Sequence, residues 1–260
     1  MHGIEGSSQQ VQTQQSPEPD ITVAMSLPGP LLFGHRGSPK THLENTLPSF
    51  LEALESGLDG LETDAQPTGD GRFLIHHDPH LPDGRLVQDL TLNQIQRDYP
   101  QFPGLEDLLE WALKQRDFHL NLELKNDANF DDGREARLVE ALERLLPRSG
   151  FLRQYVVISC FNPLSLSRMS KSGFKLGFLY HDKYLTLEQI EFGWTLPLHS
   201  VHPHHTLVDE ALLVRARAHH FQVLTWTVNQ PDEVLRLARA GVDGIIGDYP
   251  EVLKTARARG

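Results

Sequence analysis

FHLNLELK, residues 118–125, decides the fold that this sequence predicts. Polar residues alternate strictly with apolar ones along it, at His119, Asn121, Glu123 and Lys125. A period of two residues is typical of a β-strand, because successive side chains point to opposite faces of the sheet. We therefore predict a strand here, with charged side chains at its carboxyl end.

Apolar runs of similar length recur along the chain before and after this strand. With it, the predicted strands are LLFGH (31–35), LDGLETD (58–64), FHLNLELK (118–125), YVVIS (155–159), FKLGFLY (174–180), LHSVH (198–202), FQVLTWTV (221–228) and VDGIIG (242–247). Helical segments separate most of them. The segment 229–241 is well marked, because Pro231 opens it and Gly241 ends it.

The number and order of these strands predict the architecture. Strands that alternate with helices form a parallel sheet, and eight such units are the count of a closed (β/α)8 TIM barrel. An open doubly wound sheet is the alternative. That fold normally has a glycine-rich nucleotide loop after its first strand, and HRGSPK (35–40) is not such a loop.

Two segments fall outside this repeat. Residues 1–28 are rich in Gln, Ser and Pro and have little to bury, which predicts a disordered polar tail before a barrel domain over 29–260. After the second strand, the extended run FLIHHD (73–78) leads into a polar stretch over 79–104. We interpret this stretch as a small insert in the barrel, and we predict a helix over 105–115.

Composition narrows the class of protein. The net charge of −11 in 260 residues argues against a general nucleic-acid partner and against binding to anionic membranes. The single cysteine, Cys160, excludes an internal disulfide framework and a cysteine-based zinc site. There is neither an apolar run long enough to span a membrane nor a recognisable signal peptide, so we expect a cytoplasmic protein without stable membrane insertion. The oligomeric state stays open.

Acidic side chains gather where two predicted strands end. Glu62 and Asp64 are two residues apart and face the same way, and Glu123 holds a similar place on the next strand. In a barrel these ends meet at one rim, where three carboxylates would repel each other strongly. A hard divalent cation removes that repulsion, and oxygen ligands suit Mg²⁺ or Ca²⁺. We predict that the three residues hold one such ion.

Basic side chains are expected at the same rim. Arg36 offers a planar fork and Lys125 a point charge, which together with a metal is a common way to hold a phosphate. His35 and His77 have imidazoles whose pKa lies near neutral pH, so they suit a base and an acid beside the phosphate. Flanking glycines at 34 and 37 are expected to let substrate approach the backbone.

Several nearby residues have more than one possible role. His202 is expected to line the substrate pocket or to support the rim, and Trp226 to pack against substrate or to belong to the core. We expect Glu44 to brace Arg36 and Asn45 to cap the following helix. We expect Asp78 either to orient a neighbouring histidine or only to begin a turn. The run VHPHHT (201–206) could hold zinc, but it comes late in the chain, unlike the His-x-His of zinc amidohydrolases.

The order and spacing of these motifs resemble the glycerophosphodiester phosphodiesterase family. The matching segments are GHRG (34–37), ENTLPSF (44–50), GLDGLETD (57–64), HHDP (76–79), LNLELK (120–125), VHP (201–203), WTVN (226–229) and GVDGIIGDYP (241–250). The resemblance implies His35 and His77 as the catalytic pair and Arg36 and Lys125 as phosphate ligands. It implies metal ligation by the three carboxylates named above.

The resemblance also implies a reaction. The family hydrolyses glycerophosphodiesters to sn-glycerol 3-phosphate and an alcohol. In one mechanism the substrate's 2-hydroxyl attacks phosphorus, two histidines move the protons, and water opens a cyclic phosphate. The stretch HLPDGRLVQ (80–88) departs from the family's pattern beside the site, which leaves the head group open.

Two alternatives of different classes remain. One is a phospholipase-type barrel enzyme that releases a cyclic phosphate, for which a lipid-facing apolar loop is expected and none is evident in the sequence. The other is a non-catalytic phosphate-binding barrel, which would have lost a histidine or a carboxylate. All seven residues proposed for catalysis, phosphate binding and metal ligation are present in this chain.

Overall fold

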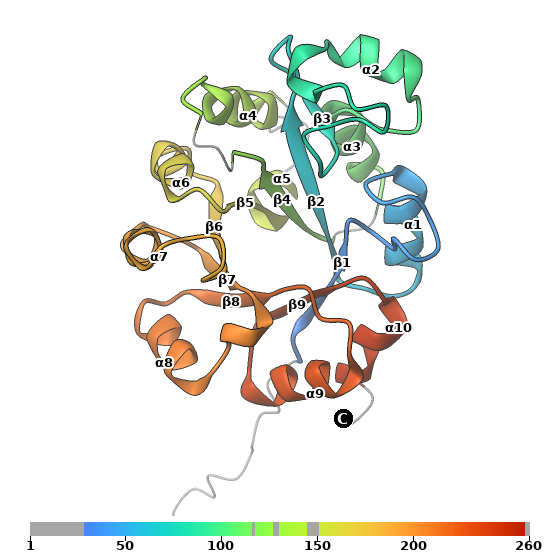
Figure 1. The fold of residues 1–260 in the computed structure, drawn as a ribbon. Coiled ribbons are helices and arrows are strands. Elements are labelled where there is room, and N and C mark those ends of the chain that lie inside the picture. Colours follow the sequence, from blue (N-terminus) through green and yellow to red (C-terminus); the bar gives the residue numbers. More distant parts are fainter. Residues whose placement is uncertain (1–28, 116–117, 127–129, 145–150, 258–260) are drawn as a thin grey trace, which may run out of the picture.

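The structure is a computed structural model that describes residues 29–115, 118–126, 130–144 and 151–257 (Figure 1). The predicted disordered tail, residues 1–28, lies outside these ranges. In the described ranges no helix is both long enough and apolar enough to cross a membrane.

Eight parallel strands form a closed barrel, as the sequence predicts. They are β1 (Leu31–His35), β2 (Gly60–Pro67), β4 (His119–Leu124), β5 (Val156–Cys160), β6 (Lys175–Tyr180), β7 (Ser200–Pro203), β8 (Gln222–Thr225) and β9 (Gly244–Gly247). Each pairs with its neighbour in the ring, and β1 pairs with both β9 and β2. The pairing of β1 with β2 closes the ring, which rules out the open doubly wound sheet.

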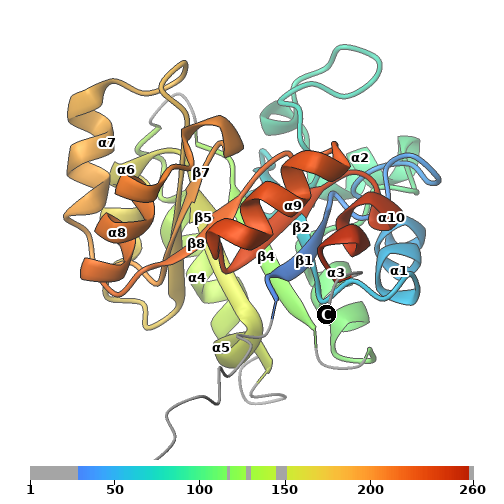
Figure 2. The ribbon, with the colours of Figure 1, turned by 90° about the horizontal axis from the view of Figure 1, so that it is seen from below.

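Helices surround the barrel on its outer side (Figures 1 and 2). They are α1 (Leu47–Glu55), α3 (Leu105–Ala112), α4 (Arg134–Glu143), α6 (Pro163–Met169), α7 (Leu187–Trp194), α8 (Glu210–Ala218), α9 (Pro231–Ala240) and α10 (Pro250–Leu253). The short helix α5 (Phe151–Tyr155) instead lies at one end of the barrel. The predicted ends of α9 are confirmed, since Pro231 lies in its first turn and Gly241 ends it with φ 82°. A positive φ is one that glycine adopts without steric cost.

Alternation along β4 explains how one strand serves both the core and the site. Leu120, Leu122 and Leu124 are buried in the apolar core that the strands share with the surrounding helices. The intervening residues have the opposite orientation, because successive side chains in a strand alternate between its faces. Glu123 therefore points into the barrel, where the carboxyl ends of the strands gather the polar residues.

The stretch after β2 folds into a small structure of its own. β3 (Phe73–Ile75) pairs antiparallel with β2, outside the ring. The chain then forms a 3₁₀ turn, η1 (Val87–Asp89), and helix α2 (Leu92–Asp98). These segments share a separate apolar cluster, which consists of Leu74, Leu81, Val87, Leu92, Ile95 and Phe102. A core of this kind keeps the stretch ordered beside the strand that carries the acidic residues.

Candidate active site

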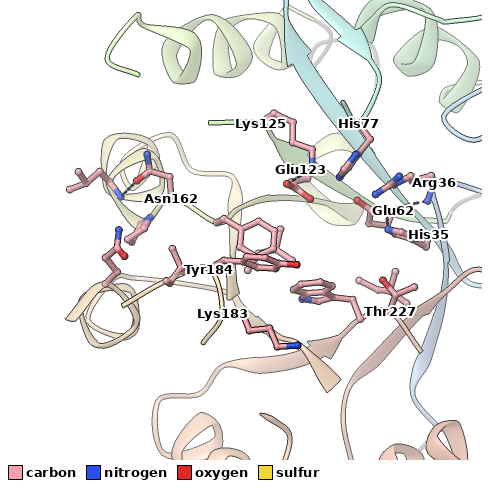
Figure 3. Close-up of a pocket in the computed structure, with 18 of the residues that line it drawn as sticks. His35, Arg36, Glu62, His77, Glu123, Lys125, Asn162, Lys183, Tyr184 and Thr227 are labelled. Atoms are coloured by element: carbon pink, nitrogen blue, oxygen red, sulfur yellow. Dashed lines mark hydrogen bonds and ion pairs between the residues drawn. The ribbon is translucent and has the colours of Figure 1, made fainter. Parts of the chain in front are cut away.

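A pocket of about 940 Å³ lies at the carboxyl ends of the barrel strands (Figure 3). It brings together residues that the sequence places on separate strands and loops. Those predicted residues that line it are His35, Arg36, Glu62, His77, Glu123, Lys125 and Trp226. Asp64 lies beneath them and is 1% exposed. The predicted residues therefore meet at the carboxyl ends of the strands, where a barrel enzyme is expected to have its active site.

The three carboxylates predicted to bind metal lie close together. One oxygen from each of Glu62, Asp64 and Glu123 is within 4.8 Å of the others, and all three side chains are buried. Asp64 and Glu123 are register partners on neighbouring strands, and Glu62 precedes Asp64 by two residues. In the part of the chain that the structure describes, no other group of three His, Cys, Asp or Glu residues meets this criterion.

The electrostatics of this acidic triad favour a bound cation. Burial raises the pKa of Glu62 well above its ordinary value, and the charges of Asp64 and Glu123 raise it further. Buried carboxylates so close together are stable only when positive charge or protons compensate them. An all-oxygen donor set matches the preference of Mg²⁺ and Ca²⁺, so the residues present fit the metal that the sequence predicts.

Lys125 supplies part of the compensating charge. Its Nζ lies 2.8 Å from Asp64 Oδ1 and 2.7 Å from Glu123 Oε1, and it is almost fully buried. Burial alone would lower the pKa of Lys125, but the two carboxylates raise it above its ordinary value. The ammonium therefore stays charged at neutral pH, between the triad and the pocket.

Replacing this lysine is expected to destabilise the fold. In metal-free buffer with EDTA, Lys125→Met leaves Asp64 and Glu123 without their cation, and we expect the free energy of unfolding to fall by about 3–5 kcal/mol. Urea unfolding measures this loss. As a control, Arg85→Met removes ion pairs to Asp83 and Asp98 that are exposed, and should change stability little. Equal losses of stability in the two variants would show that the buried ion pairs of Lys125 contribute no more to the free energy of unfolding than the exposed ion pairs of Arg85.

The turn after β1 explains the glycines on either side of His35-Arg36. Arg36 has φ 54°, and its backbone N–H donates to Glu62 Oε2 at 3.1 Å. A Cβ on Gly34 would lie 2.3 Å from the Gly37 carbonyl oxygen, and one on Gly37 would lie 2.4 Å from Ser49 Oγ. Both glycines are therefore required by the packing of the turn itself, and the expectation that they let substrate approach the backbone stays a prediction.

The Arg36 side chain is held in place by acidic neighbours. Its Nη1 donates to Glu44 Oε1 at 2.9 Å, which confirms that Glu44 braces the arginine. Its Nε lies 3.4 Å from Asp64 Oδ2. Burial would lower the pKa of Arg36, but Asp64, Glu62 and Glu44 together raise it. The guanidinium is thus a fixed positive charge that lines the pocket beside the acidic triad.

Asn45 has a different role from the predicted helix cap. The N-cap of α1 is Thr46, and Asn45 precedes it with φ 57°. Asn45 Nδ2 donates to Asp64 Oδ2 at 2.9 Å, and its Oδ1 accepts from Thr63 Oγ1 at 2.7 Å. The amide is therefore engaged with β2, where it orients one carboxylate of the acidic triad and cannot cap the helix.

A carboxylate that the sequence reasoning missed orients His35. The ring N–H at His35 Nδ1 donates to Asp248 Oδ1 at 2.7 Å. Asp248 follows β9 directly and is held by Asn229, whose Nδ2 donates to Asp248 Oδ2 at 2.7 Å. The sequence did contain a signal for this role, because Asp248 follows directly after the predicted strand 242–247. With Nδ1 engaged, Nε2 of His35 is the nitrogen left for the pocket, 3.9 Å from Glu62 Oε2.

His77, like His35, is oriented by a hydrogen bond from its Nδ1 to an aspartate. Its Nδ1 donates to Asp78 Oδ1 at 2.7 Å, so of the two expected roles Asp78 has that of orienting a histidine. Gln66 Nε2 donates to the His77 carbonyl at 2.7 Å and fixes the backbone. Burial lowers the pKa of His77, and the charge of Lys125 lowers it further, although Asp64 opposes them. The neutral ring, which can accept a proton, is therefore favoured.

His202 is not on the pocket wall, so its predicted contact with substrate is wrong. It is fully buried, its Nε2 is 2.8 Å from Ser200 Oγ, and burial lowers its pKa to about 3. Its carbonyl accepts a hydrogen bond from Trp226 Nε1 at 2.8 Å. Its neighbour in β7, Val201, belongs to the apolar core that the strands share with the helices, so His202 faces the inside of the barrel. It therefore supports the rim through Trp226.

The late histidine run does not form a metal centre among the described residues. The rings of His204 and His205 lie 4.5 Å apart, and that of His181 lies 4.3 Å from His204. His204 Nδ1 pairs with Thr206 Oγ1, and His205 Nδ1 donates to Glu233 Oε1. No group of three ligands forms there, which disfavours the zinc interpretation.

Comparison with known proteins points to one family. The glycerophosphoryl diester phosphodiesterase family matches residues 35–252. A glycerophosphodiester phosphodiesterase of Caldanaerobacter subterraneus is 30% identical over 86% of this chain and 96% of its own length. A second one, from Bacillus altitudinis, is also 30% identical, over 85% of this chain and 95% of its own.

A solved structure resembles the chain as well. An Oleispira antarctica phosphodiesterase, solved in complex with the product sn-glycerol-3-phosphate, superposes with a TM-score of 0.69 at 25% identity and covers 88% of this chain and 97% of its own. The three matches each span nearly the whole barrel and nearly the whole of the other protein, so the likeness extends beyond short motifs.

Proposed function

Because the chain belongs to the glycerophosphoryl diester phosphodiesterase family, we propose that it hydrolyses glycerophosphodiesters to sn-glycerol 3-phosphate and an alcohol through two histidines and one divalent cation. One observation carries this proposal: His35, His77 and the acidic triad meet at a single pocket. Each histidine has its Nδ1 bonded to a carboxylate, which leaves the other ring nitrogen for proton transfer.

The charges of the site suit a phosphodiester. When all three carboxylates of the acidic triad are ionised, they outnumber Arg36 and Lys125 by one negative charge, which disfavours binding of an anion. A divalent cation held by the triad turns this into one net positive charge, which matches the single negative charge of a phosphodiester. Arg36 then offers its planar fork to the phosphoryl oxygens, and Lys125 offers a point charge.

Two histidines at one pocket can move both protons of the reaction. One accepts the proton of the attacking hydroxyl, which is the substrate's own 2-hydroxyl or a water molecule. The other donates a proton to the oxygen of the leaving alcohol, so the bond from phosphorus to that oxygen breaks. If the 2-hydroxyl attacks, a cyclic phosphate forms, and a water molecule opens it while the same histidines exchange their roles.

Glu62, Asp64 and Glu123 would hold the cation, either Mg²⁺ or Ca²⁺. When bound, the cation would lower the pKa of the attacking hydroxyl and neutralise charge on the phosphoryl oxygens. Asn45 fixes the Asp64 carboxylate through its 2.9 Å hydrogen bond, and the Arg36 backbone N–H fixes that of Glu62. Such partners preorganise the ligands, so less order has to be gained when the ion binds.

The direct test is release of glycerol 3-phosphate from glycerophosphocholine and glycerophosphoethanolamine, measured by a coupled glycerol-phosphate assay. We expect turnover with Mg²⁺ or Ca²⁺ and loss of turnover in His77→Ala. A cyclic glycerophosphate that accumulates without glycerol 3-phosphate would favour the phospholipase-type alternative. No release from any diester, by a folded protein loaded with metal, would contradict the proposal.

A further inference from the structure

A second cavity, of about 90 Å³, lies at the amino-terminal end of the barrel, opposite the active site. The first residues of three strands line it, namely His119 of β4, Lys175 of β6 and Gln222 of β8. Helix α5 lies at the same end, and its last residue, Tyr155, also contributes to the lining (Figure 2). Gln222 is exposed, so a ligand can enter the cavity from solvent at this end.

The strand pattern explains why polar side chains meet inside the barrel here. Leu120, Leu176 and Val223 each follow one of these first residues and belong to the apolar core shared with the helices. Because successive side chains alternate between the two faces of a strand, the residues before them face the barrel interior. They come from alternate strands, whose inward side chains form one layer in a barrel of this kind. The amino-terminal end of the barrel therefore carries a polar layer.

Asn121 is the most buried polar residue of this cavity. It is 1% exposed, and by the same alternation it faces the barrel interior one step above His119. Among the residues that the structure describes, neither its Nδ2 nor its Oδ1 has a hydrogen-bond partner. Buried amides almost always have partners, because an amide without them is destabilising. A ligand that satisfies Asn121 has to offer both an acceptor and a donor.

The other polar residues give the cavity a positive potential. Lys175 Nζ donates to the Gln154 carbonyl at 2.6 Å, and an ammonium has three N–H groups, so two remain for a ligand. Burial lowers the pKa of His119 and of His199, and the charge of Lys175 lowers both further. The described part of the cavity lining contains no aspartate or glutamate that could neutralise this charge.

Two aspartates act on these histidines from outside the cavity lining. Asp59 and Asp243 each raise the pKa of one histidine, but more weakly than Lys175 lowers it. Each also accepts a backbone N–H at 2.8 Å, that of Leu32 and that of Val223 respectively. The polar groups that a ligand meets inside the cavity are therefore neutral or positive.

We propose that this cavity binds one inorganic phosphate ion, between Asn121 and Lys175. The phosphate oxygens accept hydrogen bonds from the lysine ammonium, from the Asn121 amide and from the imidazole N–H groups of His119 and His199. At neutral pH inorganic phosphate keeps a proton, and this O–H donates to Asn121 Oδ1. Sulfate and chloride have no such donor. The proposed site is separate from the active site and does not rest on the proposed function.

The size of the cavity suits free phosphate and excludes larger esters. A cavity needs at least about 10–15 Å³ to hold one water molecule, so about 90 Å³ has room for a ligand of roughly six non-hydrogen atoms. Inorganic phosphate is of this size. Glycerol 3-phosphate has about twice as many non-hydrogen atoms as inorganic phosphate and is too large.

Thermal unfolding in EDTA tests the proposal. Sodium phosphate replaces sodium gluconate at constant pH and ionic strength, and the gluconate ion is too large for the cavity. We expect about 10 mM phosphate to raise Tm by at least about 2 °C, because a ligand that binds only the folded state stabilises it. Sulfate strengthens apolar burial in general, as phosphate does, but lacks the proton. We expect sulfate to give less than half of this shift, and equal shifts would overturn the inference.

Matched variants assign the difference between phosphate and sulfate to this cavity. Asn121→Leu removes the amide and Lys175→Met removes the charge, and each should abolish the difference. Lys171→Met changes an exposed lysine that does not line the cavity and should leave the difference unchanged. If Asn121→Leu does not fold, Lys175→Met decides the result. A difference that persists in either folded cavity variant would overturn the inference, because phosphate would then bind elsewhere.

A crystal structure of the protein grown with phosphate locates the ion. We expect tetrahedral electron density in contact with Asn121 and Lys175. Water alone in the cavity would overturn the inference, because water molecules would then satisfy the Asn121 amide.

Discussion

His35→Ala is expected to lower kcat for glycerophosphodiester hydrolysis by about 10²–10⁴-fold, the usual contribution of a positioned acid or base. The imidazole lines the pocket, and its Nδ1 is engaged by Asp248, so the alanine removes a group already oriented toward the reacting atoms. KM should change little, because Arg36 and Lys125 remain to bind the phosphate. Steady-state kinetics with glycerophosphocholine measure both quantities.

Substitutions of Asp248 are expected to lower kcat less than His35→Ala does. As a positioning residue it acts through His35, so Asp248→Asn should lower kcat by roughly 10–100-fold. Asp248→Glu keeps the carboxylate and should recover part of the loss. A merely structural role predicts instead that Asn, the closer match in size, is the milder substitution. Thermal unfolding of each variant controls for folding, and full activity of folded His35→Ala would exclude this histidine from catalysis.

Removal of the divalent cation should abolish hydrolysis and also lower the thermal stability. A ligand that binds only the folded state at a hundredfold excess over its Kd stabilises it by about 2.7 kcal/mol, which for a domain of this size raises Tm by roughly 5–10 °C. We expect EDTA to cause both losses, and added Mg²⁺ or Ca²⁺ to restore hydrolysis and the original Tm. The shift in Tm does not depend on turnover, so it reports metal binding separately from catalysis.

Two glutamates of the pocket provide the control. Glu123→Gln removes a charge from the acidic triad and should largely abolish the Tm shift on addition of metal. Glu188→Gln changes an exposed glutamate that lines the same pocket outside the acidic triad and should preserve the shift. Equal shifts in both variants would place the ion elsewhere, and undiminished hydrolysis in EDTA would show that the reaction needs no metal.

Much of the architecture could be read from local patterns. Alternation in FHLNLELK and the regular succession of strands and helices predict a closed barrel, and the pairing of β1 with β2 confirms it. The acidic triad was also predictable, because Asp64 and Glu123 lie near the ends of neighbouring strands and a parallel sheet brings such ends together. Strand periodicity and strand ends are properties of a few consecutive residues, which a sequence displays directly.

Other features depend on contacts between distant segments. Asp248 and His35 are 213 positions apart, so the hydrogen bond between them exists only once β9 pairs with β1. Asn45 looked like a helix cap, and its bond to Asp64 was not visible in the sequence. His202 looked available to substrate until the position of β7 buried it.

The sequence by itself therefore determined most of the side chains that reach the carboxyl end of the barrel, because strand alternation and the places where strands end are local. The tertiary structure alone decided which of those side chains face one another and which are buried. The physical reason is that burial and side-chain contacts depend on how distant segments pack, and no short stretch of sequence contains that information.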